Sequence, residues 1–499
     1  AGIIRPAVRA SDGGTAVALG AVSLIIASDL PPVAILTANR TSGAIINGET
    51  NPLNVSFDGG NSYDDGASLE YSFSPLGDGS YSAPSGNANF NFGYDRSGQF
   101  TAMMRVVDSS GQQALAMLPI TVEQVTGFRS NVVYERYNSP PYNALAIVGG
   151  RPAVLFRQIG PTSADDGLYY SRALDAEGRL WGEPVQLTDN SNHGDYFDLA
   201  VIAGNPAIAW YKFSDGKVYY RRASGPTGQT LSDWNNAEVL ISGNGSVDQK
   251  VKLLEVSGNP AVLWSDGSNV MYVRATGGSG TGDFAGDWTD APFNIVTGSF
   301  VQAYPGFAMI DGNPAIVYRN FATDEVTYLR ATTATGASAI DWPVAGVAVD
   351  GSNHGTGRAN LLQVNGAPAV SFFDADGDSA IRYTRATTST GTDVADWPTA
   401  VVISEGFGNG NTFHDIAIVG GRPAIVYEDF QSNAATSYCR ANDANGSSWG
   451  APMRVAPRIN MNDVMYEHLD LEELNGFPVV SGFHANWSRI LVCTMETEL

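Results

Sequence analysis

The sequence predicts an all-β protein whose main part is a closed ring of seven similar sheets, a seven-bladed β-propeller. Three observations lead to this fold class: a phrase that recurs seven times, a composition rich in turn residues, and the lack of a sustained helical period. The chain has 499 residues, including 56 glycines and 25 prolines. These two types make up about 16% of the chain, against roughly 12% in average proteins. Such an excess is typical of many short strands joined by tight turns.

The repeated phrase is Gly-x-Pro followed by a small aliphatic residue. Its prolines are Pro152, Pro206, Pro260, Pro314, Pro368, Pro423 and Pro478, spaced 54 or 55 residues apart. In each repeat an alternating apolar run precedes the phrase and a β-rich run follows it. A Tyr-x-Arg phrase, a Gly-rich turn ending in Trp and a last short apolar run come next, although the seventh repeat is shorter. Four short strands per period of about 50 residues indicate one propeller blade.

The two ends of the repeat region predict how the ring closes. The seventh repeat stops after its third strand, at residues 490–494, so it lacks an outer strand. The β-rich segment 131–134 precedes the first repeat and can supply that strand. Closure of this kind would remove an exposed sheet edge. We therefore expect the propeller to span residues 126–499, closed by a strand from before its first blade.

Residues 31–125 form a different unit with alternating runs of its own. The phrases Phe57-Asp58-Gly59, Asp64-Asp65-Gly66, Gly77-Asp78-Gly79 and Val106-Val107-Asp108 belong to it. In these phrases the segment resembles the PKD domain, an immunoglobulin-like β-sandwich that is common in secreted and surface proteins. The resemblance implies a PKD-like β-sandwich that acts as a spacer or contact module in an extracellular setting.

Residues 1–30 belong to neither unit. The stretch from Ala16 to Leu30 is almost entirely apolar or small, and a loose tail of this kind would expose apolar surface. This apolar N-terminal arm could add an extra strand to its own sandwich. It could instead add a strand to a neighbouring copy, which would build filaments or sheets. Both alternatives remain open at the level of the sequence.

The charge balance and the cysteines exclude several classes of function. With 28 basic and 51 acidic residues, the net charge is −23, which argues against a nucleic-acid partner because such proteins carry basic patches. No apolar stretch is long enough to predict a transmembrane segment. The chain opens at Ala1 without an initiator Met, which fits a secreted, extracellular or cell-surface protein. Cys439 and Cys493 occupy equivalent positions in neighbouring blades, too far apart for a disulfide, so we expect two buried thiols.

The six Tyr-x-Arg pairs and the turns before Trp are read as structural. A reaction centre needs one set of groups, whereas six copies in rotation indicate packing between blades. The turns at 175–181 and 443–449 resemble the Asp-box of sialidase-like repeat propellers from secreted bacterial proteins. In that family the box stabilises a turn, so the resemblance implies the fold and not an activity. No catalytic residue is assigned, and the sequence leans towards a protein that is not an enzyme.

Binding residues are expected where the blades differ. All five histidines fall on or near one face of the predicted ring, and the position six residues after each proline is polar but variable. The predicted binding mouth consists of His193, Asp266, Asn320, His354, Asp374, His414, Asp429, His468 and His484. Asp374, Asp376 and Asp378 place carboxylates at alternate positions of a tight turn, which suits calcium, a cation that prefers oxygen ligands.

These observations favour a secreted, non-catalytic surface or extracellular-matrix protein. In this hypothesis the propeller is an interaction scaffold for adhesion, and the arm joins copies of the chain or contacts a surface protein or glycan. A glycan-binding lectin with sites between blades is the first alternative. A sialidase-like propeller glycosidase is the second.

Overall fold

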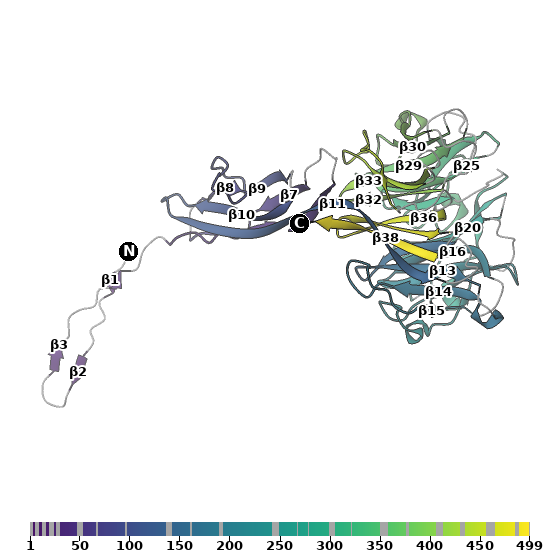
Figure 1. Cartoon of the computed structure of the whole chain (residues 1–499), viewed down its shortest axis with the longest axis horizontal. Coiled ribbons are helices and arrows are strands. Elements are labelled where there is room, and N and C mark those ends of the chain that lie inside the picture. Colours follow the sequence, from purple (N-terminus) through teal and green to yellow (C-terminus); the bar gives the residue numbers. More distant parts are fainter. Residues whose placement is uncertain are drawn as a thin grey trace. The chain divides into compact units, whose positions relative to one another are not determined.

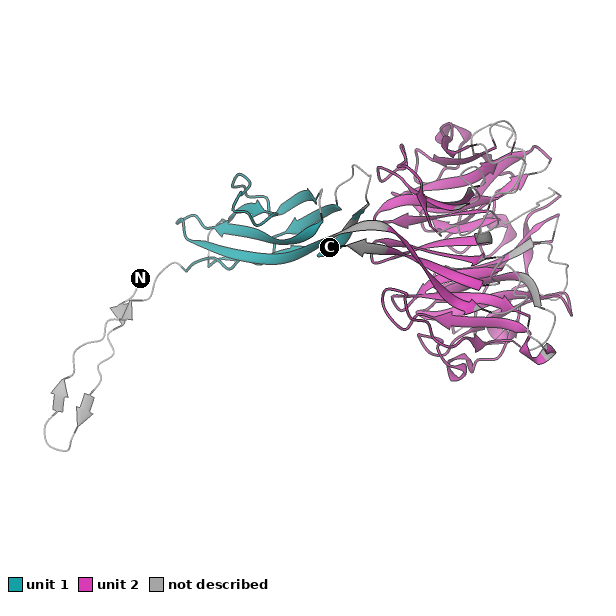
Figure 2. Ribbon diagram, in the orientation of Figure 1, with its two compact units in different colours: residues 1–125, 497–499 teal, residues 126–496 magenta. Residues whose placement is uncertain are grey.

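The computed structural model describes two compact units, residues 1–125 with 497–499 and residues 126–496 (Figure 2). In the arm it describes residues 3–4, 9–11, 16–18 and 24–25. From residue 30 to residue 498 it describes everything except residues 47–52, 66–67, 95–96, 136–141, 160–161, 189–192, 242–248, 267, 278, 299–304, 321, 350–357, 376–378, 406–412, 430–434, 456–464 and 485–488.

The predicted all-β fold class is confirmed, with strands in every part of the described chain (Figure 1). The helical elements among the described residues are single 3₁₀ turns. They are η1 (Ser163–Asp165), η2 (Leu231–Trp234), η3 (Ala285–Asp287), η4 (Ala339–Asp341) and η5 (Val394–Asp396). Within the described residues, no helix has the length and apolar character needed to cross a bilayer.

The first three repeats each form one four-stranded antiparallel sheet, and the strands follow sequence order. The first sheet comprises β12 (Asn143–Val148), β13 (Arg151–Gln158), β14 (Gly167–Arg172) and β15 (Val185–Gln186). The second comprises β16 (His193–Ile202), β17 (Asn205–Lys212), β18 (Lys217–Arg222) and β19 (Val239–Leu240). The third comprises β20 (Gln249–Val256), β21 (Asn259–Ser265), β22 (Val270–Arg274) and β23 (Phe293–Val296).

The next three repeats form sheets of the same kind, so six four-stranded sheets follow one another along the chain. The fourth comprises β24 (Gly306–Ile310), β25 (Asn313–Asn320), β26 (Glu325–Arg330) and β27 (Val347–Ala348). The fifth comprises β28 (Ala359–Val364), β29 (Ala367–Asp374), β30 (Ala380–Arg385) and β31 (Val401–Ser404). The sixth comprises β32 (His414–Val419), β33 (Arg422–Asp429), β34 (Ala435–Arg440) and β35 (Met453–Arg454).

The last repeat confirms the predicted closure. Its strands are β36 (Met465–Leu474), β37 (Phe477–His484) and β38 (Arg489–Glu498), and the long strand β11 (Gln113–Glu135) lies next to β38. Side chains reinforce this seam: the Ser130 hydroxyl lies 3.4 Å from the Cys493 sulfur, and Asn131 Nδ2 donates to Thr494 Oγ1 at 3.4 Å. A strand from before the first repeat therefore completes the last sheet.

The Gly-x-Pro phrase marks the turn between the first and second strands of every repeat. Both turn residues adopt left-handed backbone conformations, for example Ala203 (φ 46°) and Gly204 (φ 80°). Two consecutive positive φ values define the type I′ turn, whose twist matches that of the flanking strands. The second turn residue is glycine in all seven repeats, because that conformation is costly for other residues.

The Tyr-x-Arg phrases hold neighbouring repeats together, as expected. Five of the six tyrosine rings meet the tryptophan of the next repeat edge-on, with ring centroids 5.2 to 5.4 Å apart, and the sixth, Tyr438, meets Phe128. The five pairs are Tyr170–Trp234, Tyr220–Trp288, Tyr272–Trp342, Tyr328–Trp397 and Tyr383–Trp449. The arginines of the same five phrases donate to carbonyls at the end of the first strand of their own sheet, as Arg222 Nε does to Ile202 O at 2.8 Å.

Cys439 and Cys493 are both buried and form no disulfide. Burial raises the pKa of Cys493 to about 11, so this thiol stays protonated at neutral pH. The expectation of two buried thiols is confirmed.

The unit before the propeller packs two sheets around one core. One sheet has the order β5 (Thr37–Ala38), β7 (Leu53–Asp58) and β9 (Asn89–Tyr94). The other contains β8 (Glu70–Ser74), β10 (Gly98–Val107) and the first half of β11, with β6 (Ser42–Ile46) parallel to β11. Val55, Met104 and Ile120 are fully buried between them. This is a β-sandwich, as the sequence predicted.

The described strands of the arm pair with one another. β1 (Ile3–Ile4) pairs with β4 (Leu24–Ile25), and β2 (Arg9–Ser11) pairs with β3 (Ala16–Ala18), both antiparallel. Among the described residues none of these four strands joins a sheet of the sandwich. Strand addition to a neighbouring copy remains a proposal.

Candidate functional site: the central channel

The first strands of the repeats form the wall of a central channel. Each contacts the first strand of the next repeat, in the order β12, β16, β20, β24, β28, β32 and β36, and β36 contacts β12. The position eight residues before the repeat proline lies at the same register in every described first strand. Asp198, Asn360 and Asp470, for example, all pair with the residue three after the proline.

This position carries five different residue types in the seven repeats. Its seven residues are Ala144, Asp198, Lys252, Gly306, Asn360, Asp415 and Asp470. Neighbouring positions on the same strands vary far less: the next residue is Leu, Ile or Phe in all seven repeats. A polar group that changes within a constant apolar frame indicates selection for a role other than packing.

Three aspartates at this position hold the main chain of the following repeat. Asp198 Oδ2 accepts from Leu253 N at 2.8 Å and Asp415 Oδ2 accepts from Leu471 N at 2.8 Å. Asp470 Oδ2 accepts from Leu145 N at 3.2 Å across the seam where the ring closes. These bonds fix the orientation of the three carboxyl groups in the channel.

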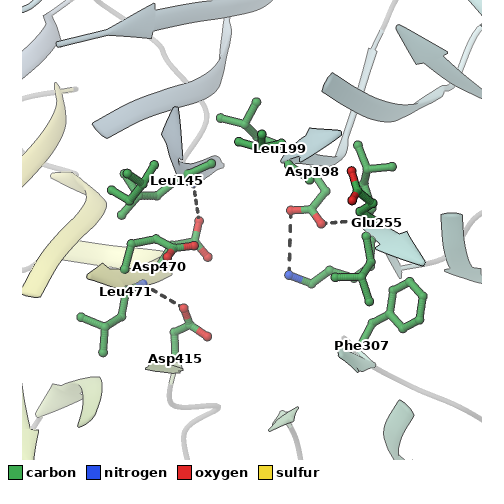
Figure 3. A pocket seen from close by; sticks show the side chains of 16 residues that line it. Leu145, Asp198, Leu199, Glu255, Phe307, Asp415, Asp470 and Leu471 are labelled. Atoms are coloured by element: carbon green, nitrogen blue, oxygen red, sulfur yellow. Dashed lines mark hydrogen bonds and ion pairs between the residues drawn. The ribbon is translucent and has the colours of Figure 1, made fainter. Parts of the chain in front are cut away.

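The channel contains a cavity of about 410 Å³, shown in Figure 3. Asp198 lies on one side, while Asp415 and Asp470 lie on the opposite side. Glu472 and Lys252 also line the cavity, and Lys252 Nζ lies 3.9 Å from Asp198 Oδ1. Leu145, Leu199, Leu253, Leu471 and Phe307 supply apolar surface between the charges. Glu255 is the fifth acidic side chain of the lining, so a ligand of monosaccharide size would fit among five carboxyl groups and one ammonium group.

The electrostatics of the cavity are unbalanced towards negative charge. Burial, together with the charges of Asp415 and Asp470, raises the pKa of Glu472 to about 8. Glu472 is therefore mostly protonated at neutral pH. Burial alone would lower the pKa of Lys252, but the surrounding carboxylates, Asp198 first, raise it above its ordinary value. The cavity thus offers aspartate oxygens, one protonated acid and one ammonium group side by side.

One end of the channel carries cationic and aromatic groups. Arg358, Phe413, His414 and His468 lie together with Asp415 and Asp470 around a small extension of the cavity. The Arg358 guanidinium lies 3.0 Å from the centroid of the Phe413 ring, and the rings of Phe413 and His468 are 5.0 Å apart. This end is buried, because His414 and His468 are only 4% and 2% exposed.

The structure brings together two of the nine predicted mouth residues, His414 and His468, at this end of the channel. Three others are placed elsewhere. Asp266 accepts hydrogen bonds from Ser268 N and Asn269 N within its own turn. Asn320 lies in a groove between the third and fourth repeats. Asp374 forms an ion pair with Arg382, with Nε 2.7 Å from Oδ2.

The remaining predicted residues cannot be placed. The side chains of His193, Asp429 and His484, and the whole of His354, lie outside the described residues.

Of the predicted calcium ligands, Asp376 and Asp378 lie outside the described residues. Asp374 already faces a cation, the guanidinium of Arg382. Among the described residues no group of three or more His, Cys, Asp or Glu side chains is arranged to hold a metal ion.

The sequence prediction missed Asp198, Lys252, Asp415, Asp470 and Glu472. The same repeat alignment contained the signal, because the position eight before the proline varies as strongly as the position six after it. The alignment does not show which way a side chain points. Only the sheet register shows that the position eight before the proline lines the channel. At the later position, the described side chains of Asp266 and Asp374 are engaged within their own sheets.

Comparisons with known proteins find only weak structural similarity to solved structures. No protein-family model and no curated protein matches it. Among solved structures it is similar to Penicillium chrysogenum alpha-L-arabinanase complexed with arabinobiose, with 10% identity and a TM-score of 0.41 over 74% of this chain and 97% of that one. It is also similar to the PKD1 domain of Vibrio anguillarum Epp, with 24% identity and a TM-score of 0.15 over 19% of this chain and 96% of that one.

A third similar structure concerns the promiscuous specificity of carbohydrate-binding modules from the beta-sandwich superfamily. It shares 16% identity with a TM-score of 0.18 over 37% of this chain, and the chain spans 59% of its length. These likenesses are too distant to assign an activity, so function has to rest on the channel.

Proposed function

We propose that the chain is a non-catalytic binding protein of the extracellular surface whose propeller takes a sugar in its central channel. The single observation that supports this is the cavity of about 410 Å³ where five carboxyl groups and one ammonium converge. It lies where the repeats differ most. The proposal includes the finer architecture implied by the sequence, seven blades preceded by a PKD-type sandwich.

The chemistry of the channel suits a ligand rich in hydroxyl groups. Hydroxyls donate to ionised carboxylates and accept from Lys252 or from the protonated Glu472. Asp198, Asp415 and Asp470 are held by main-chain N–H groups, so little conformational entropy is lost when a ligand binds. The excess negative charge disfavours an anionic ligand, which excludes acidic sugars from this site.

The test is binding by the full chain to a glycan array, followed by calorimetry with the best ligand. Asp470→Asn and Asp415→Asn should each weaken binding at least tenfold, because an amide is a poorer acceptor than a carboxylate. An amide is tolerated at this register, since the fifth repeat has Asn360 there. Asp290→Asn, an exposed carboxylate outside the channel, should bind as the wild type does. Equal binding by all three variants would exclude the channel as the site.

Self-assembly through the arm is the second part of this proposal. Residues 1–30 are apolar, and a strand exchanged between copies would cover that surface and join chains into filaments. Electron microscopy of the full chain and of a variant lacking residues 1–30 tests this. Filaments that persist after the deletion would refute the role of the arm.

Glycoside hydrolysis is a second candidate function, favoured by one observation. Glu472, with a pKa of about 8, is a protonated acid that shares the cavity with aspartates, and glycosidases use a pair of carboxyl groups as general acid and as nucleophile or base. Chromogenic glycosides would reveal the activity. Loss of hydrolysis in Glu472→Gln with retained sugar binding would establish it, whereas no turnover by the wild type would leave binding as the function.

A further inference from the structure

A second cavity, separate from the channel, lies between the third and fourth repeats. Its volume is about 450 Å³. One wall is β23 with the adjacent Thr297, and the other is formed by β25, β26, β27 and the turn at residues 343–346. We call this cavity the side groove.

The side groove lies where the fourth repeat has small residues in place of the large ones of the first and second repeats. Tyr318 in β25 pairs with Thr327 in β26, which pairs with Ala348 in β27. At the same register in the second repeat, Trp210 stacks on Tyr219 with centroids 5.7 Å apart, and Leu240 follows. The first repeat has Phe156 and Tyr169 there, 6.1 Å apart. In the fourth repeat, the residue paired with Tyr318 is Thr327, so no aromatic ring of β26 stacks on Tyr318.

Close packing of the backbone at Gly346 leaves no room for a side chain on this wall of the side groove. A Cβ placed on Gly346 would lie 2.4 Å from Thr327 Cγ2 and 2.8 Å from Tyr328 O. The second contact is with main chain, which cannot move without disturbing the sheet. Glycine is therefore required at this point, and the depth of the side groove is built into the fold.

The side groove has an apolar floor and a polar rim with little charge. Tyr318, Trp342 and Ile295 are buried in the floor, and Val344 is fully exposed beside it. The rim carries Asn294, Thr297, Asn320, Thr323 and Glu325. Glu325 is the one ionisable rim group among the described residues, so the lining favours an uncharged ligand over an anion.

We propose that the side groove is a second, independent binding site for a neutral sugar unit. The C–H face of a sugar ring would pack on the apolar floor while its hydroxyls bond to the amide and hydroxyl groups of the rim. A wholly apolar ligand would bury those rim groups without partners, which is costly. The site extends the proposed function to the side of the propeller and does not require the channel.

Filling the groove tests the proposal. Thr327→Met copies Met271, which occupies this register in the third repeat, and Ala348→Leu copies Leu240 in the second. The probes are neutral tetrasaccharides of glucose, xylose, mannose and arabinose, measured by calorimetry and saturation-transfer NMR on the full chain. The double variant should lose one binding site per chain or at least tenfold in affinity. Thr399→Met, an equivalent change at an exposed site in the fifth repeat, should bind as the wild type does.

Two further variants make the outcome decisive. Asn294→Ala removes only an exposed rim amide and should weaken binding several-fold, even if the double variant folds poorly. Asp470→Asn should leave this site intact, since it alters only the channel. Binding that is unchanged in the groove variants, or that disappears entirely in Asp470→Asn, would refute the side groove while leaving the channel proposal standing. Capture of apolar peptides with no sugar bound would refute it as well.

Discussion

The third strands and the first strands of the same repeats follow opposite chemical rules. Third strands repeat Tyr-x-Arg almost unchanged, and each described tyrosine hydroxyl in five successive sheets donates to a carbonyl in the following repeat, as Tyr220 OH does to Thr281 O at 2.8 Å. First strands keep their apolar residues but change the polar residue that lines the channel. Both strands bridge neighbouring sheets, one with uniform side chains and the other with differing ones.

The difference teaches how function is placed in a repeat protein. Contacts that every repeat needs must be made by the same residues, because each sheet meets its neighbour with the same geometry. A ligand in the channel cavity can touch several sheets at once, so each of these repeats can contribute a different group. Repetition therefore identifies packing, and departures from it identify the places where binding is possible.

Breaking a uniform contact should have the largest effect. Trp288 is 8% exposed, contacts Tyr220 edge-on at 5.3 Å and donates through Nε1 to Gly282 O at 3.0 Å. Trp288→Ala should lower the free energy of unfolding by about 3–5 kcal/mol, measured by chemical denaturation. Phe284→Ala in the same turn removes an exposed ring and should change it by less than about 0.5 kcal/mol. Equal stability of the two variants would contradict the packing role.

Removing the charge of Glu472 should have the next largest effect on the free energy of unfolding. The effect should appear only above acidic pH. Its pKa is about 8 in the folded chain against an ordinary value of 4.5, so the folded state binds more protons between these values. Wild-type stability should therefore fall as pH rises from about 4.5 to about 8. Glu472→Gln lacks this loss and should be more stable than wild type by about 2–4 kcal/mol at pH 9.

The measurement is the unfolding free energy of both proteins from pH 4 to pH 9. The stability difference should be near zero at pH 4, open between pH 5 and pH 8, and stay constant above that range. Glu405→Gln, outside the channel, should follow the wild-type curve. A constant difference at every pH would mean that folding does not raise the pKa of Glu472.

Exchanging the variable group in one repeat should have the smallest effect. Asn360 Nδ2 donates to His414 O at 2.8 Å, and a carboxylate cannot make this bond. Asn360→Asp should cost about 1–2 kcal/mol at neutral pH, and the cost should shrink in acid as the new carboxyl gains a proton. Exposed Asn235→Asp should be neutral in the same denaturation experiment. If Asn360→Asp is neutral too, this register tolerates any polar group, and the choice of residue there does not affect the free energy of unfolding.

Much of the fold could be predicted because each of its cues is local. The type I′ turns, the alternating strands and the Tyr–Trp contacts recur at fixed spacing, so one repeat explains the others. The closing strand was also predictable, since the last repeat is one strand short. Of the predicted mouth residues, His414 and His468 line the channel, whereas Asp374 pairs with Arg382. Period and composition do not reveal which side of a strand faces an opening.

The sequence alone determined the class of fold, the repeat and its closure, because hydrophobic alternation and turn chemistry act over a few residues. Only the tertiary structure decided which polar residues meet. Asp198 and Asp470 are 272 positions apart in the chain, yet both line one cavity. Their convergence, and the raised pKa of Glu472 that follows from it, depend on closing the ring. Charge density in a channel is a property of the assembled circle and of no single repeat.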